Sequence, residues 1–143
     1  MRTFVFSILI IPLGFISCSQ ESQPIDYGKD NCHWCQMRIM DPKFGSEAIT
    51  DKGRVYKFDS GECLLHYLNE SDAAHSLLEV TDFESPESLV AADTAWFLVS
   101  EKMPSPMGGF LNAFHSKDRA LAYQAKFGGE IFNWNQVKNE FGK

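Results

Sequence analysis

The chain has 143 residues, with 13 Lys or Arg against 19 Asp or Glu, so its formal net charge is −6. This acidic balance argues against a nucleic-acid-binding protein, because phosphate backbones are bound by basic surfaces. A negative surface instead favours cations. The length is sufficient for one domain with a hydrophobic core, and an aromatic content of 13% predicts that this core is rich in rings.

The N-terminal segment has the composition of an export signal followed by a tether. Behind Arg2 lies an uncharged, mostly apolar run that is too short to cross a bilayer but is typical of a secretory signal. A small residue directly before Cys18 matches the end of a bacterial lipobox. We predict a lipoprotein signal peptide over 1–17, a lipidated Cys18 with a polar tether over 18–30, and an exported domain over 31–143. The lipid would anchor the domain to a membrane at the periplasmic face of the cell envelope. An ordinary secretory signal cut nearby is the alternative.

Hydrophobic periodicity predicts the same order of elements twice along the chain. In the first half we expect two strands joined by a tight turn, then a helix and a third strand, over 46–51, 54–58, 61–71 and 77–83. In the second half we expect two strands, a helix, a short strand and a final helix, over 96–100, 110–114, 117–127, 129–132 and 133–141. Ser60 or Asp59 should cap the first helix and Ser116 the second, which should end at Gly128 and Gly129. The predicted fold class is α+β, with duplicated ββαβ units in one compact domain.

The segment NCHWCQMRIM, residues 31–40, concentrates residue types that bind metals. Cys32 and Cys35 place two thiols three residues apart, Met37 follows, and Met40 ends the segment. Soft sulfur ligands favour monovalent copper, and zinc where thiolates dominate. Zinc normally takes two separated ligand pairs, iron–sulfur clusters take four thiolates, and covalent haem attachment needs His directly after the second Cys; none of these patterns is in the sequence. The segment therefore indicates a soft site of two or three ligands, a low coordination number that monovalent copper accepts.

A second segment with two thioethers is EKMPSPMGGF, residues 101–110. Met103 and Met107 stand among prolines and a glycine pair in a predicted loop between two strands. Core methionines usually lie within regular elements, so methionines exposed in a stiff polar loop require another explanation. We expect this loop and the segment 31–40 to lie at one end of the duplicated fold.

Other interpretations of these residues remain open. A CxxC pair in an exported protein is most often a structural disulfide or a redox pair, so a thiol–disulfide oxidoreductase using Cys32 and Cys35 is the alternative function. In a thioredoxin-like site, however, the motif follows a strand and opens a helix, whereas here it precedes the first predicted strand. We expect Cys63 to be a small core residue and Met40 to pack inward. No residue set has the spacing of a hydrolase, and we predict that the protein is not an enzyme.

Taken together, these segments resemble the NosL family. The resemblance rests on a lipoprotein signal, the pattern Cys-x-x-Cys-x-Met, VYKFDSGECLLHYL, and SPMGG followed shortly by AF, over residues 31–132. It implies a pair of ββαβ units. It also implies an exported accessory lipoprotein that binds one Cu(I) and delivers copper to nitrous oxide reductase, or a related copper enzyme, with that enzyme's assembly machinery.

The resemblance also implies a ligand set and a mechanism. By motif position the copper ligands are Cys35, Met37 and Met107, with Cys32 and His33 as further candidates. One thiolate and two thioethers would leave a face of the ion open, so that ligands from the client displace them one at a time. Gln36 departs from the family's pattern, which usually has Gly at that position, and a residue with a Cβ atom restricts the backbone there.

A lyase is a third interpretation, because the NosL fold is related to that of organomercurial lyase. That chemistry needs an acidic partner beside paired cysteines. The sequence places no such residue, since Asp59 near a helix start is interpreted as a cap.

Overall fold

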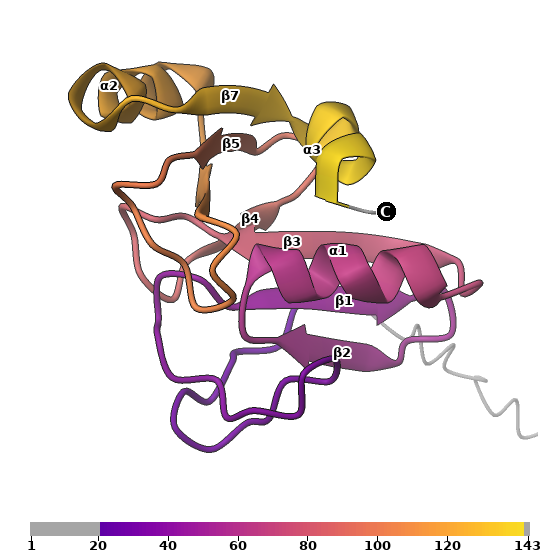
Figure 1. The fold of residues 1–143 in the computed structure, drawn as a ribbon. Coiled ribbons are helices and arrows are strands. Elements are labelled where there is room, and N and C mark those ends of the chain that lie inside the picture. The colour runs from indigo at the N-terminus through magenta and orange to yellow at the C-terminus, as the bar shows by residue number, and fades with distance from the viewer. Residues whose placement is uncertain (1–20, 142–143) are drawn as a thin grey trace, which may run out of the picture.

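The computed structural model describes residues 21–141. The predicted signal peptide and Cys18 lie outside the described residues, so both stay predictions. The elements along the chain, drawn in Figure 1, are β1 (Ser46–Thr50), β2 (Val55–Phe58), α1 (Gly61–Glu70), β3 (His75–Thr81), β4 (Leu89–Ala91), β5 (Trp96–Val99), β6 (Leu111–Phe114), α2 (Lys117–Phe127), β7 (Glu130–Asn133) and α3 (Trp134–Phe141). No helix among the described residues is long and apolar enough to span a bilayer.

The strands form two antiparallel sheets, ordered β2-β1-β3-β4 and β6-β5-β7. In each sheet the first strand of a ββαβ unit lies between the second and the third. The predicted duplication is therefore confirmed in both element order and strand order. The sequence analysis missed β4, a three-residue strand that pairs with β3, because it is too short to show a periodicity and follows a polar stretch.

Both ββαβ helices begin at the predicted serines. The hydroxyl of Ser60 accepts a hydrogen bond from the backbone N–H of Cys63, and that of Ser116 accepts one from Arg119. Of the two cap candidates for α1, the structure thus selects Ser60 and leaves Asp59 outside the helix. After α2 the chain turns at Gly128, whose φ is +69°.

Successive side chains of β5 point to opposite faces, so the second sheet lies between two cores. Phe97 and Val99 face the main core, which the second sheet shares with the first sheet, α1 and α3, whereas Trp96 and Leu98 face a smaller cluster beneath α2. Helix α1 packs against β1 and β2 and also against β6 and α3 (Figure 1). Helix α1 is therefore in contact with both units.

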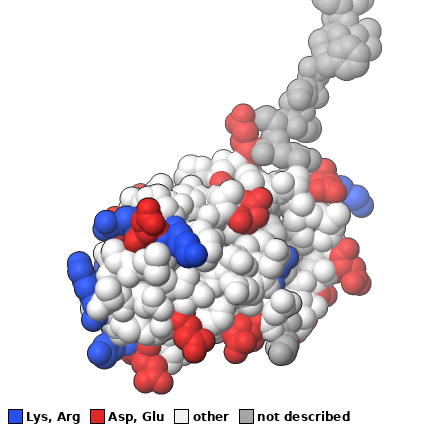
Figure 2. Space-filling model, turned by 90° about the horizontal axis from the view of Figure 1, so that it is seen from above, with Lys and Arg blue, Asp and Glu red and all other residues white. Residues whose placement is uncertain are grey.

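Charged side chains are distributed over the surface seen in Figure 2. Acidic residues are scattered across this face, and most basic ones lie at the left. Acidic and basic groups alternate there instead of forming a continuous basic surface.

The turn after α2 gives a test of the packing. A Cβ atom on Gly129 (φ +101°) would lie 2.1 Å from the carbonyl oxygen of Val99, whereas one on Gly128 would meet nothing within 4 Å. Gly128→Ala should lower the free energy of unfolding by about 1–3 kcal/mol, because the backbone there (φ +69°, ψ −166°) lies in a region nearly confined to glycine. Gly129→Ala should cost about 3 kcal/mol or more, because overpacking is added. Urea unfolding measures both variants, and equal losses would contradict the packing described.

Candidate metal centre

The CxxC segment is a closed turn attached to the edge of the first sheet. The backbone N–H of Cys32 donates to the carbonyl of Met37 at 2.7 Å, and that of Gln36 donates to the carbonyl of Cys32 at 3.0 Å. The N–H of His33 donates to the carbonyl of Lys57 in β2 at 2.8 Å. The two cysteines are therefore fixed relative to the sheet, and the segment does not open a helix.

Three cysteines converge at this point. Cys63, three residues after the cap of α1, points toward the turn, and its Sγ atom and those of Cys32 and Cys35 all lie within 4.8 Å of one another. Within 21–141 this is the one group of three or more His, Cys, Asp or Glu side chains arranged to hold a metal ion. All three are free thiols. Cys63 is fully buried, as expected of a core residue, but it also belongs to the sulfur cluster.

The three thiols differ in charge and in access. The pKa of Cys32 is lowered to about 5, chiefly because the thiol of Cys63 donates a hydrogen bond to its sulfur, and the backbone N–H groups of Asp59 and Cys35 add to this. The pKa of Cys63 is raised, because it is the donor to Cys32 and because it is buried. Burial likewise raises the pKa of Cys35. The cluster thus has one thiolate, on the fully buried Cys32, and its only partly exposed thiol is Cys35.

The sequence analysis interpreted Asp59 as a helix cap, but Ser60 is the cap of α1, and the carboxyl group of Asp59 instead interacts electrostatically with Cys32. The side chain of Asp59 is buried, and burial raises the pKa of its carboxyl group despite a hydrogen bond from the backbone N–H of Met40. Its negative charge and that of Cys32 also repel each other. The structure therefore places an acidic group beside the cysteines, where the sequence placed none. The signal for this position in the sequence was that Asp59 and Ser60 lie between the hydrophobic end of a strand and the start of a helix.

The four methionines of the two segments divide into exposed and buried ones. Met37 is 49% exposed and Met107 36%, so both thioethers reach solvent. Met40, expected to pack inward, is instead 63% exposed. Met103, expected to be exposed, is 5% exposed and packs in the cluster beneath α2. Of the two methionines in the loop 101–110, Met107 is thus the one whose thioether is exposed and could bind an ion.

The structure places His33 among aromatic rings. Its ring lies 4.4 Å from that of Tyr56 and 5.6 Å from that of Tyr67, measured between centroids. It does not belong to the cysteine group found among the described residues.

The loop 101–110 reaches the first turn of α1 from the second sheet, as Figure 1 shows. The hydroxyl of Ser105 donates a hydrogen bond to the carboxylate of Glu62, the residue before Cys63. Both sulfur-bearing segments therefore meet at one turn of one helix.

A profile of the NosL family matches residues 25–141. The chain belongs to the NosL family. Its fold is similar to the crystal structure of the copper chaperone NosL from Shewanella denitrificans, with a TM-score of 0.72 and 24% sequence identity over 82% of this chain and 95% of that one. Among curated proteins, none matches the chain.

Gln36, where this NosL-family chain departs from the family's pattern, has a strained backbone conformation. Gln36 has a φ of +63°, in the left-handed region where glycine is unstrained and other residues are not. Its side-chain amide donates a 2.6 Å hydrogen bond to the carbonyl of His33, which offsets part of the strain. The backbone restriction expected from the sequence is therefore present, directly after Cys35.

Substitution of Gln36 should separate strain from hydrogen bonding. Gln36→Ala keeps the left-handed strain and loses the bond, so it should destabilise the fold by about 0.5–1.5 kcal/mol. Gln36→Gly relieves the strain of about 1–2 kcal/mol but adds flexibility to the unfolded chain, so its stability should exceed that of the alanine variant. Urea unfolding of the reduced, metal-free protein gives the order, and alanine at least as stable as glycine would contradict the strain.

Removal of Cys63 should shift the titration of Cys32. In the reduced, metal-free protein, thiolate absorbance should show one thiol with a pKa of about 5. Cys63→Ala removes the strongest donor to that thiolate, so the lowest midpoint should move up toward the ordinary value of about 8.5. Cys35→Ala is the matched control and should move it less, because Cys35 contributes less to the lowered pKa. An unchanged midpoint in Cys63→Ala would contradict the hydrogen bond.

Proposed function

We propose that this NosL-family chain is an exported Cu(I) metallochaperone that carries one ion and transfers it by ligand exchange. The observation that supports this most directly is the convergence of three cysteine sulfurs within 4.8 Å. Sulfur ligands without a hard donor favour monovalent copper over harder ions. The thiolate of Cys32 offsets the positive charge of the ion, which lowers the cost of holding the ion in a buried site.

We assign the exposed side of the site to Cys35, Met37 and Met107. These are the ligands that the family motif indicates, and all three side chains are at least partly exposed. The buried thiolate of Cys32 lies behind Cys35 and supplies the charge. His33 is less suited to be a ligand, because its ring packs on Tyr56.

The proposed ligands differ in their exposure to solvent, and this suggests the order in which they release the ion. The thioethers of Met37 and Met107 are neutral, weak ligands at the surface, so an incoming ligand would displace them first. The sulfur of Cys35 and then the sulfur of Cys32 would be replaced later. The ion stays Cu(I) throughout. The thiol of Cys35 loses its proton when it binds the ion and takes one up again when a ligand of the client replaces it.

The client and the place of transfer are the remaining parts of the proposal. Membership in the NosL family favours nitrous oxide reductase, or a related copper enzyme, together with its assembly machinery. The solved relative from Shewanella denitrificans is described as a copper chaperone. A lipid on Cys18 would hold the domain at the membrane, at the periplasmic face of the cell envelope where copper is delivered to exported enzymes.

A thiol–disulfide oxidoreductase remains the second candidate, because a thiolate lies next to protonated thiols. In such enzymes, though, the attacking thiolate is accessible to the substrate. Here Cys32 is fully buried, and the partly exposed Cys35 has a raised pKa. Turnover of insulin disulfides by the metal-free protein would favour this function instead.

Anaerobic competition for Cu(I) between the reduced domain and a chromogenic chelator tests the proposal. Cys35→Ala and Met107→Ala should each weaken binding by more than about tenfold, since losses of 10–100-fold already follow changes in outer-shell partners. Met40→Ala is the matched control, because Met40 is an exposed methionine on the same segment as Met37, and it should leave the affinity unchanged. If Met107→Ala behaves like Met40→Ala, the loop assignment is wrong. If the reduced protein takes up no Cu(I), the proposed function is wrong.

A further inference from the structure

We propose that Glu62 is a positioning residue for Met107: its buried carboxylate holds the loop 101–110 against the first turn of α1, so that the thioether is presented to the ion. This inference rests on the proposed function. It adds a residue that is not itself a ligand and that the sequence analysis gave no role.

The hydrogen bonds of Glu62 are directed at this loop. Its side chain is 3% exposed, and Oε1 accepts a hydrogen bond from the hydroxyl of Ser105, which is also buried. The same oxygen accepts from the backbone N–H of Leu111, at the start of β6, at 3.4 Å. Bonds to a charged acceptor are stronger than those between neutral groups, so Glu62 restrains the loop on both sides of Met107.

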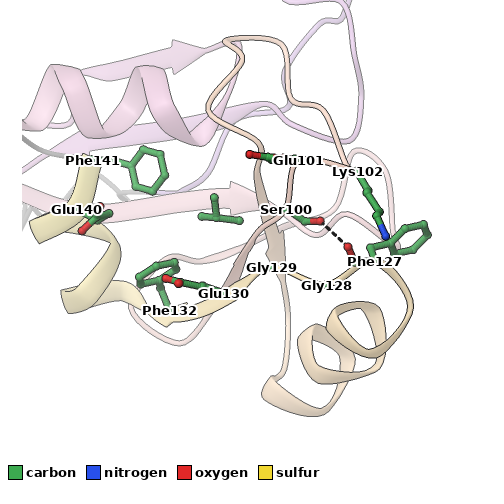
Figure 3. A pocket seen from close by; sticks show the side chains of 11 residues that line it. Ser100, Glu101, Lys102, Phe127, Gly128, Gly129, Glu130, Phe132, Glu140 and Phe141 are labelled. Carbon is green, nitrogen blue, oxygen red and sulfur yellow. Dashed lines mark hydrogen bonds between the residues drawn. The ribbon is translucent and has the colours of Figure 1, made fainter.

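At Gly109, close packing holds the loop in addition to the hydrogen bonds of Glu62. A Cβ atom there would lie 3.0 Å from both Cγ and Oε1 of Glu62 and 3.3 Å from the ring of Phe141 in α3. Phe141 and Glu101, which lies at the start of the same loop, both line a cleft of about 530 Å³ (Figure 3). The loop is thus packed between α1 and α3, and Glu62 is its contact on the α1 side.

The other restraint on the loop lies before Met107. Met103 packs beneath α2, and its carbonyl accepts a hydrogen bond from the side chain of Asn112 at 3.1 Å. Beyond it, the amide of Gly108 donates to the carbonyl of Ser105 at 3.0 Å, a bond within the loop. The contact between Ser105 and Glu62 is therefore what ties the exposed part of the loop to the helix that carries Cys63.

The second carboxylate oxygen of Glu62 favours a functional reason for this residue. Oε2 is buried and has no hydrogen-bond partner. A buried, partly unsatisfied carboxylate costs stability, so a neutral residue would serve the fold better. A weak thioether ligand, by contrast, benefits from a rigid support, because its contribution to affinity depends on being held in place.

The experiment measures Cu(I) affinity by chelator competition in the reduced domain for Glu62→Ala, Ser105→Ala, Met107→Ala and the double variant Glu62→Ala/Met107→Ala. Glu62→Ala should weaken binding by about tenfold, within the range for outer-shell partners. Glu62→Gln keeps an acceptor at Oε1 and should restore most of the affinity. The double variant should bind no more weakly than Met107→Ala alone, since Glu62 acts through Met107. Ser105→Ala, which removes one hydroxyl only, provides the same test if Glu62→Ala does not fold.

Hydrogen exchange of the metal-free protein gives a readout independent of copper. Glu62→Ala should speed exchange of the amides of Gly108 and Leu111, while the amide of Gln36 in the CxxC turn stays unchanged. Additive losses in the double variant, or unchanged affinity in Glu62→Ala and Ser105→Ala alongside a weakened Met107→Ala, would overturn the inference. If Met107→Ala itself has no effect but exchange still rises in Glu62→Ala, the ligand assignment fails and the restraint on the loop stands.

Discussion

Burial of a charged sulfur governs the arrangement around Cys32, because a thiolate removed from water is stable only where hydrogen-bond donors surround it. The donors come from three places: the thiol of Cys63 in α1, and the backbone N–H groups of Asp59 and Cys35. The start of α1, the end of β2 and the CxxC turn must therefore keep their relative positions for the charge to persist. The three cysteines that meet here form a group that could hold a metal ion.

The site arises from differences between two similar units. Cys63 stands three residues after the cap Ser60, and Arg119 stands three residues after the cap Ser116. Likewise, the first two strands are joined by a tight turn in one unit and by the long loop with Met107 in the other. The shared framework places the first turn of α1 near the long loop of the second unit. The sulfur atoms of Cys63 and Met107 stand at positions where the two units differ.

Two departures from local stability rules lie in this region. Gln36 has a backbone conformation that favours glycine, and Glu62 buries an oxygen without a partner. Elsewhere the helix caps and the alternation of strands agree with the fold. Local conflicts of this kind are expected at functional sites, where the surrounding structure has to maintain them.

The sequence by itself determined the order of the elements other than β4, the cap of α2 and the sulfur-rich segments, because these follow from periodicity, capping chemistry and residue type along a short stretch. Only the tertiary structure decided that Cys63 joins Cys32 and Cys35, that Met103 is buried while Met40 is exposed, and that Glu62 meets the second loop. Those outcomes depend on contacts between residues distant in sequence. Periodicity shows which face of a helix is buried, but it does not show which atoms from another segment that face will meet.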